Sequence, residues 1–233
     1  MKLFIDGEMH EATFIKRHNR FIAEILLDGE RHLTHVPNTG RMRELLLEGA
    51  RVIVRKVDNP LRKTQYDLLM VYTQRGILVA IDSKLPNRIL NKAFQEGSIP
   101  EFRQYNYVKA EVTFGKSKFD FSLSNNNSNA LVEAKCVTLV KENKMASFPD
   151  APTERGTRHL LELIEAKSQG IEAAVFFIIQ REDSIAFTPN QEMDKAFYGA
   201  MLKAIDEGVE FYAYNSIVKN NTVKLKDRLE IRV

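Results

Sequence analysis

The sequence predicts a protein of the α+β (or α/β) class in two parts: a small N-terminal β-barrel, followed by a mixed sheet flanked by helices. Short runs of alternating apolar and polar residues fill the first 82 residues, which is typical of antiparallel strands. Segments with apolar residues every three or four positions begin after residue 82, as amphipathic helices require. The nearly continuous apolar run 171–180 is typical of a central strand that is buried on both faces. We therefore predict domains over 1–82 and 83–233.

Six strands are expected in the first domain, at 10–17, 20–27, 30–36, 52–57, 66–73 and 77–81. Between the third and fourth strands, Asn38 or Thr39 can cap a helix of about two turns, which would run over 41–48 and stop at Gly49. Three strands, a short helix and further strands are the order of an OB-fold barrel. Such barrels bind nucleic acids in a basic groove with aromatic stacking platforms.

The best candidate for phosphate contact in this domain is the stretch 51–63. It holds one acid, Asp58, and five basic residues: Arg51, Arg55, Lys56, Arg62 and Lys63. Clustered positive charge attracts phosphates, but a solvated strand and loop is an equally good interpretation. Asn38 and Thr39 also have two interpretations, because they could simply start the helix or could contact the second domain or its ligand.

In the second domain we expect helices at 83–97, 153–169 and 193–207, each ended by a glycine. Strands are expected at 107–114, 118–123, 130–137, 171–180 and 209–214, and a basic hairpin at 218–233 closes the chain. The segment 141–152 is expected to be a polar loop. Within the strand 107–114, Glu111 has apolar neighbours, and a half-buried carboxylate there would need a partner. We therefore expect Glu111 to lie near the site as a supporting acid.

The hairpin formed by 118–137 carries the chemistry. Glu133 and Lys135 share one face of its second strand, because side chains two apart in a strand point the same way, and Asp120 lies on the strand before. The two carboxylates and the carbonyl of Ala134 are oxygen ligands that suit Mg²⁺ or Mn²⁺. Lys135 could activate a water or stabilise charge on a phosphate, as metal-assisted phosphodiester hydrolysis requires. An ordinary solvated hairpin with charged residues on its polar face is the competing interpretation.

The spacing Asp-x(12)-Glu-x-Lys resembles the restriction-endonuclease-like PD-(D/E)xK superfamily. A longer set of segments resembles the sugar fermentation stimulation protein family in order along nearly the whole chain: VPNTGRM (36–42), KAEVTFGKSKFDF (109–121), LVEAKCVTLV (131–140), FPDAPTERGTRHLLEL (148–163) and EGVEFYAY (207–214). The resemblance implies an OB-fold domain followed by a restriction-endonuclease-like mixed sheet. The chain departs from the family at Lys118, where an arginine is usual, and like the family it lacks the proline of the superfamily name, having Phe119 before Asp120.

The same resemblance implies roles for further residues. Glu96, in the last turn of the first helix, matches an acid of the family that could join the metal shell through water. The helix after the hairpin often supplies polar groups to the phosphate site, so Arg155 could hold a phosphate and His159 could donate to one. Lys118 would contact nucleic acid without the two-pronged geometry of an arginine. Arg155 and His159, four residues apart on one helix face, could equally form a salt-bridged surface with Glu162.

Composition narrows the class of protein. Among 233 residues, 44% are hydrophobic and 28% charged, which is typical of globular proteins. The single cysteine, Cys136, excludes an internal disulfide and suits a reducing cytoplasm. No apolar run is long enough to predict a membrane span, and the first residues do not resemble a signal peptide. The net charge of +3 is small, so any nucleic-acid binding must depend on local patches.

Two functional hypotheses stand out. In the first, the protein binds DNA and cuts it with a Mg²⁺-dependent nuclease site made of Asp120, Glu133 and Lys135. In the second, it is a non-catalytic DNA-binding regulator of sugar (maltose-type) utilisation, as the family name suggests. RNA remains possible as the ligand, and a homodimer is possible because superfamily nucleases often act as dimers. A protein-interaction module is a third class that the sequence leaves open.

Overall fold

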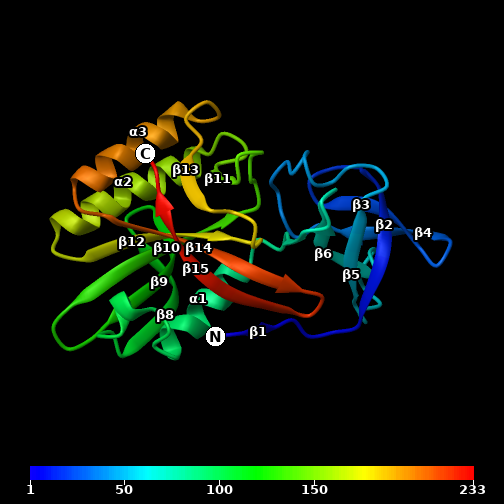
Figure 1. Ribbon diagram of the computed structural model, residues 1–233. Coiled ribbons are helices and arrows are strands. Elements are labelled where there is room, and N and C mark those ends of the chain that lie inside the picture. The colour runs from blue at the N-terminus through cyan, green and yellow to red at the C-terminus, as the bar shows by residue number, and fades with distance from the viewer.

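The computed structural model describes residues 1–233 and contains two sheets, each forming one part of the molecule in Figure 1. The first sheet has six strands in the order β4-β3-β2-β5-β6-β7, and a further pairing between β4 and β6 closes it into a barrel. The strands are β2 (Met9–Arg17), β3 (Ile22–Leu27), β4 (Glu30–His35), β5 (Arg51–Lys56), β6 (Tyr66–Tyr72) and β7 (Leu78–Ala80). The OB-like barrel expected from the sequence is therefore confirmed.

The inside of the barrel explains why these segments pair. Apolar side chains at alternate positions, such as Phe14, Ile25 and Val52, are buried in one cluster. Their polar neighbours point to solvent, because successive side chains in a strand face opposite sides of the sheet. The alternation seen in the sequence is thus the division between the barrel interior and its surface.

The helix expected at 41–48 does not form, and this expectation is wrong. Only a turn is present, in which the amides of Leu45 and Leu46 both donate to the carbonyl of Met42. Side-chain oxygens accept the amides that would start a helix: Gly40 N donates to Asn38 Oδ1 at 2.8 Å, and Arg41 N to an Asp150 carboxylate oxygen at 2.9 Å. These polar groups hold the chain in a loop, and side chains that bond nearby amides are known to compete with helix formation in this way.

The second sheet is mixed and has nine strands, in the order β11-β13-β15-β14-β12-β10-β9-β8, with β1 added on β15. Its strands are β1 (Leu3–Phe4), β8 (Tyr107–Phe114), β9 (Ser117–Ser124), β10 (Asn129–Val137), β11 (Met145–Phe148), β12 (Glu172–Ile179), β13 (Ala186–Pro189), β14 (Glu210–Lys219) and β15 (Thr222–Ile231). The central strands β10, β12 and β14 run parallel. Strand β9 runs antiparallel to β8 and β10, and β15 runs antiparallel to β14 but parallel to β13. The mixed sheet flanked by helices is confirmed.

Three α-helices cover this sheet: α1 (Leu85–Gln95), α2 (Glu154–Ser168) and α3 (Lys195–Asp206), with a short 3₁₀ helix at Pro100–Phe102. Helix α1 packs on one face and the pair α2 and α3 on the other, as Figure 1 shows. Caps fix where the last two begin, because Thr153 accepts from the amide of Gly156 and Asp194 from that of Phe197. None of the helices is long and apolar enough to cross a bilayer.

The C-terminal strands differ from expectation. Instead of a strand at 209–214 and a separate hairpin at 218–233, β14 continues to Lys219 and pairs along its length with β15, with an irregularity between Tyr214 and Ser216. Three short strands, β1, β11 and β13, were not expected. Strand β11 lies within the stretch 141–152 that we expected to be a loop, and it is recognisable only through its long-range parallel pairing with β13.

The two sheets are joined by a shared apolar core. Ile53, Leu69 and Met70 of the barrel belong to the same buried cluster as Ile89 and Phe94 of α1. The N-terminal strand β1 also crosses from the barrel to pair with β15, so the first residues of the chain lie on the second sheet. The barrel is consequently fixed against the second domain, and the space between them has a defined shape.

Candidate metal and nucleic-acid site

Asp120 lies where β9 and β10 separate. The ladder between these strands ends at the pair Phe121 and Val132. Just beyond it, the Asp120 carboxylate accepts the amide of Ala134 at 2.8 Å and a hydrogen bond from the side chain of Asn87 on α1. The carboxylate thus takes the place of a backbone acceptor, and this holds it beside the next part of β10.

Glu133 is buried, with 4% of its surface exposed, and only one of its two oxygens is used. Its Oε1 accepts from Lys135 Nζ at 2.7 Å and is 2.6 Å from Nδ1 of His159 on α2. Its Oε2 is buried and has no hydrogen-bond partner. A buried carboxylate oxygen without a partner is costly, so this atom is the one best suited to receive a ligand.

The tautomer of His159 follows from its second neighbour. Arg155 Nε donates to His159 Nε2 at 3.3 Å, and a guanidinium can only donate. Nε2 must therefore be the acceptor, which puts the proton on Nδ1, from where it is donated to Glu133. Arg155, His159 and Lys135 together orient Oε1 and leave Oε2 available.

The two carboxyl groups titrate in opposite directions. Burial and the charge of Glu133 together raise the pKa of Asp120 to about 6, against the opposing hydrogen bonds from Ala134 and Asn87. Burial alone would also raise the pKa of Glu133, but the charge of Lys135 and the bond from His159 lower it to about 2. Glu133 is therefore ionised at neutral pH, and its charge makes a second negative charge on Asp120 expensive unless a cation lies between them.

Both carboxylates line a cleft of about 980 Å³ between the two domains. From the second domain, the segment 148–156 forms one wall. From the barrel, the loop 38–43 and the residues Arg17, Asn19 and Arg20 form the other. Asp150 joins the walls by accepting the Arg41 amide. The site is thus built by both domains.

Several residues expected at the site do line this cleft: Asn38, Thr39, Asp120, Glu133, Ala134, Lys135 and Arg155. Asn38 does not cap a helix. Its amide group donates to the carbonyl of Ile81 and contacts the sulfur of Cys136, so it attaches the barrel loop to the second domain. His159 is nearby but only 1% exposed. Its ring supports Glu133, and the direct phosphate contact expected for it has no support in this arrangement.

Other expected residues lie elsewhere. Glu96 is at the exposed end of α1, where it pairs with Lys92. Glu111 and Lys118 pair with each other at 2.7 Å on the solvent side of β8 and β9. The expectation of a half-buried Glu111 is wrong, because its backbone has a left-handed φ of 57° and its side chain is exposed. Neither acid lines the cleft.

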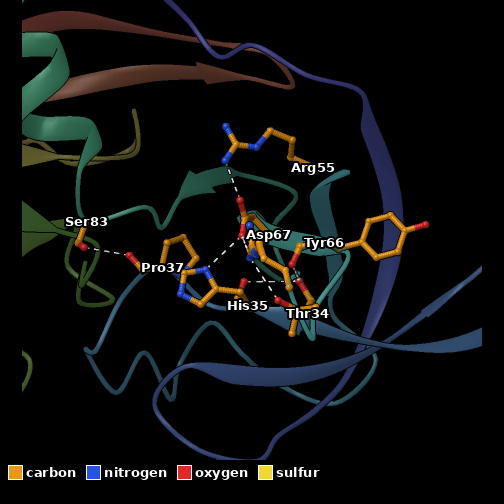
Figure 2. A network of polar contacts seen from close by, with 9 residues as sticks. Thr34, His35, Pro37, Arg55, Tyr66, Asp67 and Ser83 are labelled. Atoms are coloured by element: carbon orange, nitrogen blue, oxygen red, sulfur yellow. Dashed lines mark hydrogen bonds and ion pairs between the residues drawn. The ribbon is translucent and has the colours of Figure 1, made fainter. Parts of the chain in front are cut away.

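The basic stretch of the barrel is largely occupied by its own ion pairs. Figure 2 shows Arg55 reaching the buried Asp67, and Arg62 and His35 bind the same carboxylate. Arg51 pairs with Glu11 and lies over the ring of Tyr72. Lys56 and Lys63 are exposed. None of the five basic residues, Arg51, Arg55, Lys56, Arg62 and Lys63, lines the cleft, so their expected role in binding nucleic acid remains a prediction.

Residues that sequence analysis missed complete the site. Asn87 holds Asp120, and four arginines line the barrel wall: Arg17, Arg20, Arg41 and Arg43. Arg41 and Arg43 belong to the segment 41–48 that was expected to be a helix, and on such a helix they would be ordinary surface charges. Only the long-range contact between Asp150 and the loop 38–43 brings them to the carboxylates.

The residues present fit a hard divalent cation. Asp120 and Glu133 offer oxygen ligands, one of them the unpartnered Oε2. No group of three or more His, Cys, Asp and Glu side chains comes together anywhere in the chain to hold a metal. Two carboxylates, with waters and phosphate oxygens completing the shell, are the usual protein share of a Mg²⁺ site.

Comparisons with known proteins agree with this fold. Residues 84–222 match the model of the sugar fermentation stimulation protein RE domain, and residues 15–81 match that of the SfsA N-terminal OB domain. A sugar fermentation stimulation protein homolog from Alkaliphilus metalliredigens is 57% identical over 99% of this chain and 100% of its own length. One from Clostridium tetani is 44% identical, covering 98% and 99%. A solved structure of Pyrococcus furiosus SfsA in complex with Ca²⁺ is 26% identical, with a TM-score of 0.91 over 100% of both chains.

Proposed function

Because the chain belongs to the sugar fermentation stimulation protein family, we propose that it binds DNA and hydrolyses its phosphodiester bonds with a divalent metal ion. The observation that carries the proposal is the unpartnered Oε2 of Glu133, buried beside Asp120 in a cleft with an arginine-rich wall. A protein that only needed positive charge to bind DNA would gain nothing from burying two carboxylates beneath the path of a phosphate backbone.

Asp120 and Glu133 would hold the metal, with the carbonyl of Ala134 as a further oxygen ligand. A relative of similar fold has been solved with Ca²⁺, which supports a site for divalent cations, and Mg²⁺ or Mn²⁺ is the ion we propose for activity. When bound, such an ion supplies charge stabilisation to a phosphate and an activated water. Its charge would also relieve the repulsion that raises the pKa of Asp120.

The other residues have distinct tasks. Lys135 Nζ, held by Glu133 Oε1 at 2.7 Å, is placed to stabilise negative charge on a phosphate oxygen. Arg155 uses its Nε on His159 and lines the cleft, so its remaining N–H groups are donors that a phosphate could use. His159 keeps Glu133 ionised and turned toward the cleft.

The alternative is a DNA-binding regulator of sugar utilisation that does not cut. The unpaired arginines of the cleft favour it as far as binding is concerned, because they could hold phosphates without any metal. The two proposals differ in what the carboxylates are needed for: cleavage requires them, whereas binding alone does not.

The test is an assay of plasmid, duplex and single-stranded DNA, and of RNA, with Mg²⁺, with Mn²⁺ and with a chelator. The wild type should cut at least one substrate in a metal-dependent manner. Asp120→Asn, Glu133→Gln and Lys135→Met should each lower the rate by roughly 100-fold or more. Glu165→Gln, a matched change at an exposed acid of α2, should cut like the wild type.

Circular dichroism and thermal melting would show that each variant is folded. Unchanged cutting by folded Asp120→Asn and Glu133→Gln would rule out the proposed catalytic site. Binding without any cutting, unaffected by either variant, would favour the regulator.

A further inference from the structure

The barrel wall of the cleft carries three arginines with no partner. Arg20, Arg41 and Arg43 are exposed, line the cleft, and make no side-chain hydrogen bond or ion pair within the chain. We call these three residues the arginine rim. A guanidinium has five N–H donors arranged to bind phosphate oxygens in pairs. Three such groups facing one cleft are therefore a set of unused anion ligands.

A fourth arginine of the wall, Arg17, holds the backbone segments that carry the rim residues. Arg17 donates to the main-chain carbonyls of Arg20 at 2.6 Å, Asn38 at 2.6 Å and Gly40 at 2.6 Å. Its guanidinium therefore ties the turn that carries Arg20 to the loop that carries Arg41. Because these donors are already engaged, Arg17 has a structural task, and the rim residues are the ones left for a ligand.

Asp150 holds the same loop against the second domain. One of its carboxylate oxygens accepts the amides of Arg41 at 2.9 Å and Met42 at 3.5 Å. Gly40 permits this approach, because a Cβ atom there would come within 2.8 Å of that oxygen. The rim is thus fixed opposite the wall that contains Glu133.

The cleft has more basic side chains than acids: Arg17, Arg20, Arg41, Arg43, Lys135 and Arg155 line it. Its three acids are Asp120, Glu133 and Asp150. Asp120 and Asp150 accept backbone amides, and Glu133 is paired with Lys135. Burial lowers the pKa of Arg17; the charge of Asp150 opposes this shift and the charge of Arg20 adds to it, so Asp150 offsets part of the repulsion between the arginines. A bound polyanion would remove this repulsion.

We propose that the arginine rim binds the phosphates of a single nucleic-acid strand that runs through the interdomain cleft. The barrel would then hold nucleic acid by the edge of its loops, beside the carboxylates, and not by the basic stretch 51–63. This rests on the proposed function for the identity of the ligand, but it does not depend on cleavage.

The size of the cleft favours a single strand over a duplex. One turn of duplex is about 34 Å long, and its major groove alone is about 12 Å wide. A cleft of about 980 Å³ is at the upper end of the range for small-molecule pockets and can enclose only a few nucleotides. Glu133 and Lys135 are buried residues that line the cleft, so a backbone must enter the cleft to reach them.

The test is fluorescence anisotropy with a labelled DNA strand of about 12 nucleotides, within the range of OB-fold sites, in chelator and again in Ca²⁺. Single Arg→Ala changes at the rim should each weaken binding about tenfold. Each should also lower the slope of log K against log salt by about 0.7. Arg75→Ala removes an exposed arginine of the β6–β7 turn that has no partner and lies outside the cleft, and should bind like the wild type.

Two further measurements test where the strand binds and whether a single strand is preferred over a duplex. The triple variant Arg51→Ala, Lys56→Ala, Lys63→Ala tests the rival surface, and loss of binding there with normal binding by the rim variants would overturn the proposal. A duplex of the same sequence should compete at least tenfold less well than the strand. Equal competition would overturn the single-strand assignment.

The outcome is separable from that of the nuclease. Binding that depends on the rim, without cleavage under any metal, would sink the proposed nuclease and leave the rim in place. Cleavage that continues when the rim arginines are replaced would support the proposed nuclease and contradict the role of the rim.

Discussion

The Asp120 carboxyl group is kept at a cost to stability. Burial and the nearby charge of Glu133 raise its pKa to about 6, whereas an aspartate in an unfolded chain ionises near pH 4. Ionised Asp120 therefore destabilises the fold by about 3 kcal/mol at neutral pH in the absence of metal. Such strain is typical of a group placed for chemistry.

This predicts how Asp120→Asn changes stability with pH. As pH rises from about 4 to about 6, the unfolded state loses its Asp120 proton first, so the wild type loses stability over this window. The variant has no such proton. Its stability relative to the wild type should consequently increase by about 3 kcal/mol between pH 4 and pH 7.5, measured by urea unfolding in chelator.

In Mg²⁺ at pH 7.5 the wild type should be more stable than Asp120→Asn. An ion that binds only the folded state stabilises it, and the variant lacks the carboxylate that would bind the ion. Metal affinity of the wild type should fall as pH drops below about 6, where Asp120 becomes protonated. If the difference in unfolding free energy between Asp120→Asn and the wild type were the same at pH 4 and pH 7.5, ionised Asp120 would not destabilise the fold.

At the residue level, sequence analysis found what local spacing determines. Glu133 and Lys135 were paired correctly because they are two apart on one strand, and the turn after β9 placed Asp120 opposite. Asn87 and His159 could not be assigned in this way, because their contacts with Asp120 and Glu133 span 33 and 26 residues. An isolated histidine on a helix face gives no sign of which carboxylate it will support.

At the level of elements, long amphipathic segments were predictable and short or externally held ones were not. Helices α1, α2 and α3 follow from their apolar stripes, and α2 and α3 also from their caps. The loop 38–43 has the composition of a helix start, but its amides are taken by Asn38 and by Asp150. The latter lies more than a hundred positions away, so no local pattern could reveal it.

Gly40→Ala tests the importance of this loop. The new Cβ would come within 2.8 Å of Asp150 Oδ2 and 3.0 Å of Asn38 Oδ1, so the loop must move away from the second domain. We expect a loss of roughly 1–3 kcal/mol in unfolding free energy. Binding of a short DNA strand should weaken about tenfold, because Arg41 and Arg43 are displaced with the loop.

Gly199→Ala is the matched control. It introduces the same methyl group on α3, where nothing lies within 4 Å, and should leave the stability unchanged or raise it by about 0.5–1 kcal/mol. Normal melting and normal binding by Gly40→Ala would mean that the contact between the loop and Asp150 does not position the rim.

At the scale of the whole molecule, the two domains behave as one folding unit in their packing. The cluster that contains Met70 of β6 also contains Leu90 of α1 and Phe176 of β12, so the barrel and the second sheet lack separate cores at their junction. The strand β1 adds a second connection by pairing with β15. The relation between the walls of the cleft therefore depends on apolar packing and not only on polar contacts at its rim.

Met70→Ala tests this coupling. Met70 is fully buried at the junction, so its truncation should cost about 2–5 kcal/mol. For a chain of this size that corresponds to a fall in melting temperature of roughly 5–15 °C. Calorimetry should show a single transition in both wild type and variant, with the whole transition shifted, because neither domain can keep its core when the shared cluster is weakened.

Leu33→Ala provides the comparison, since Leu33 is 48% exposed on the barrel surface, and its removal should change the melting temperature little. Two resolved transitions, of which only one moves in Met70→Ala, would contradict the shared core. The barrel would then be free to move relative to the second domain, and the cleft could widen. A widened cleft would no longer favour a single strand over a duplex, so the calorimetric result and the duplex competition must agree.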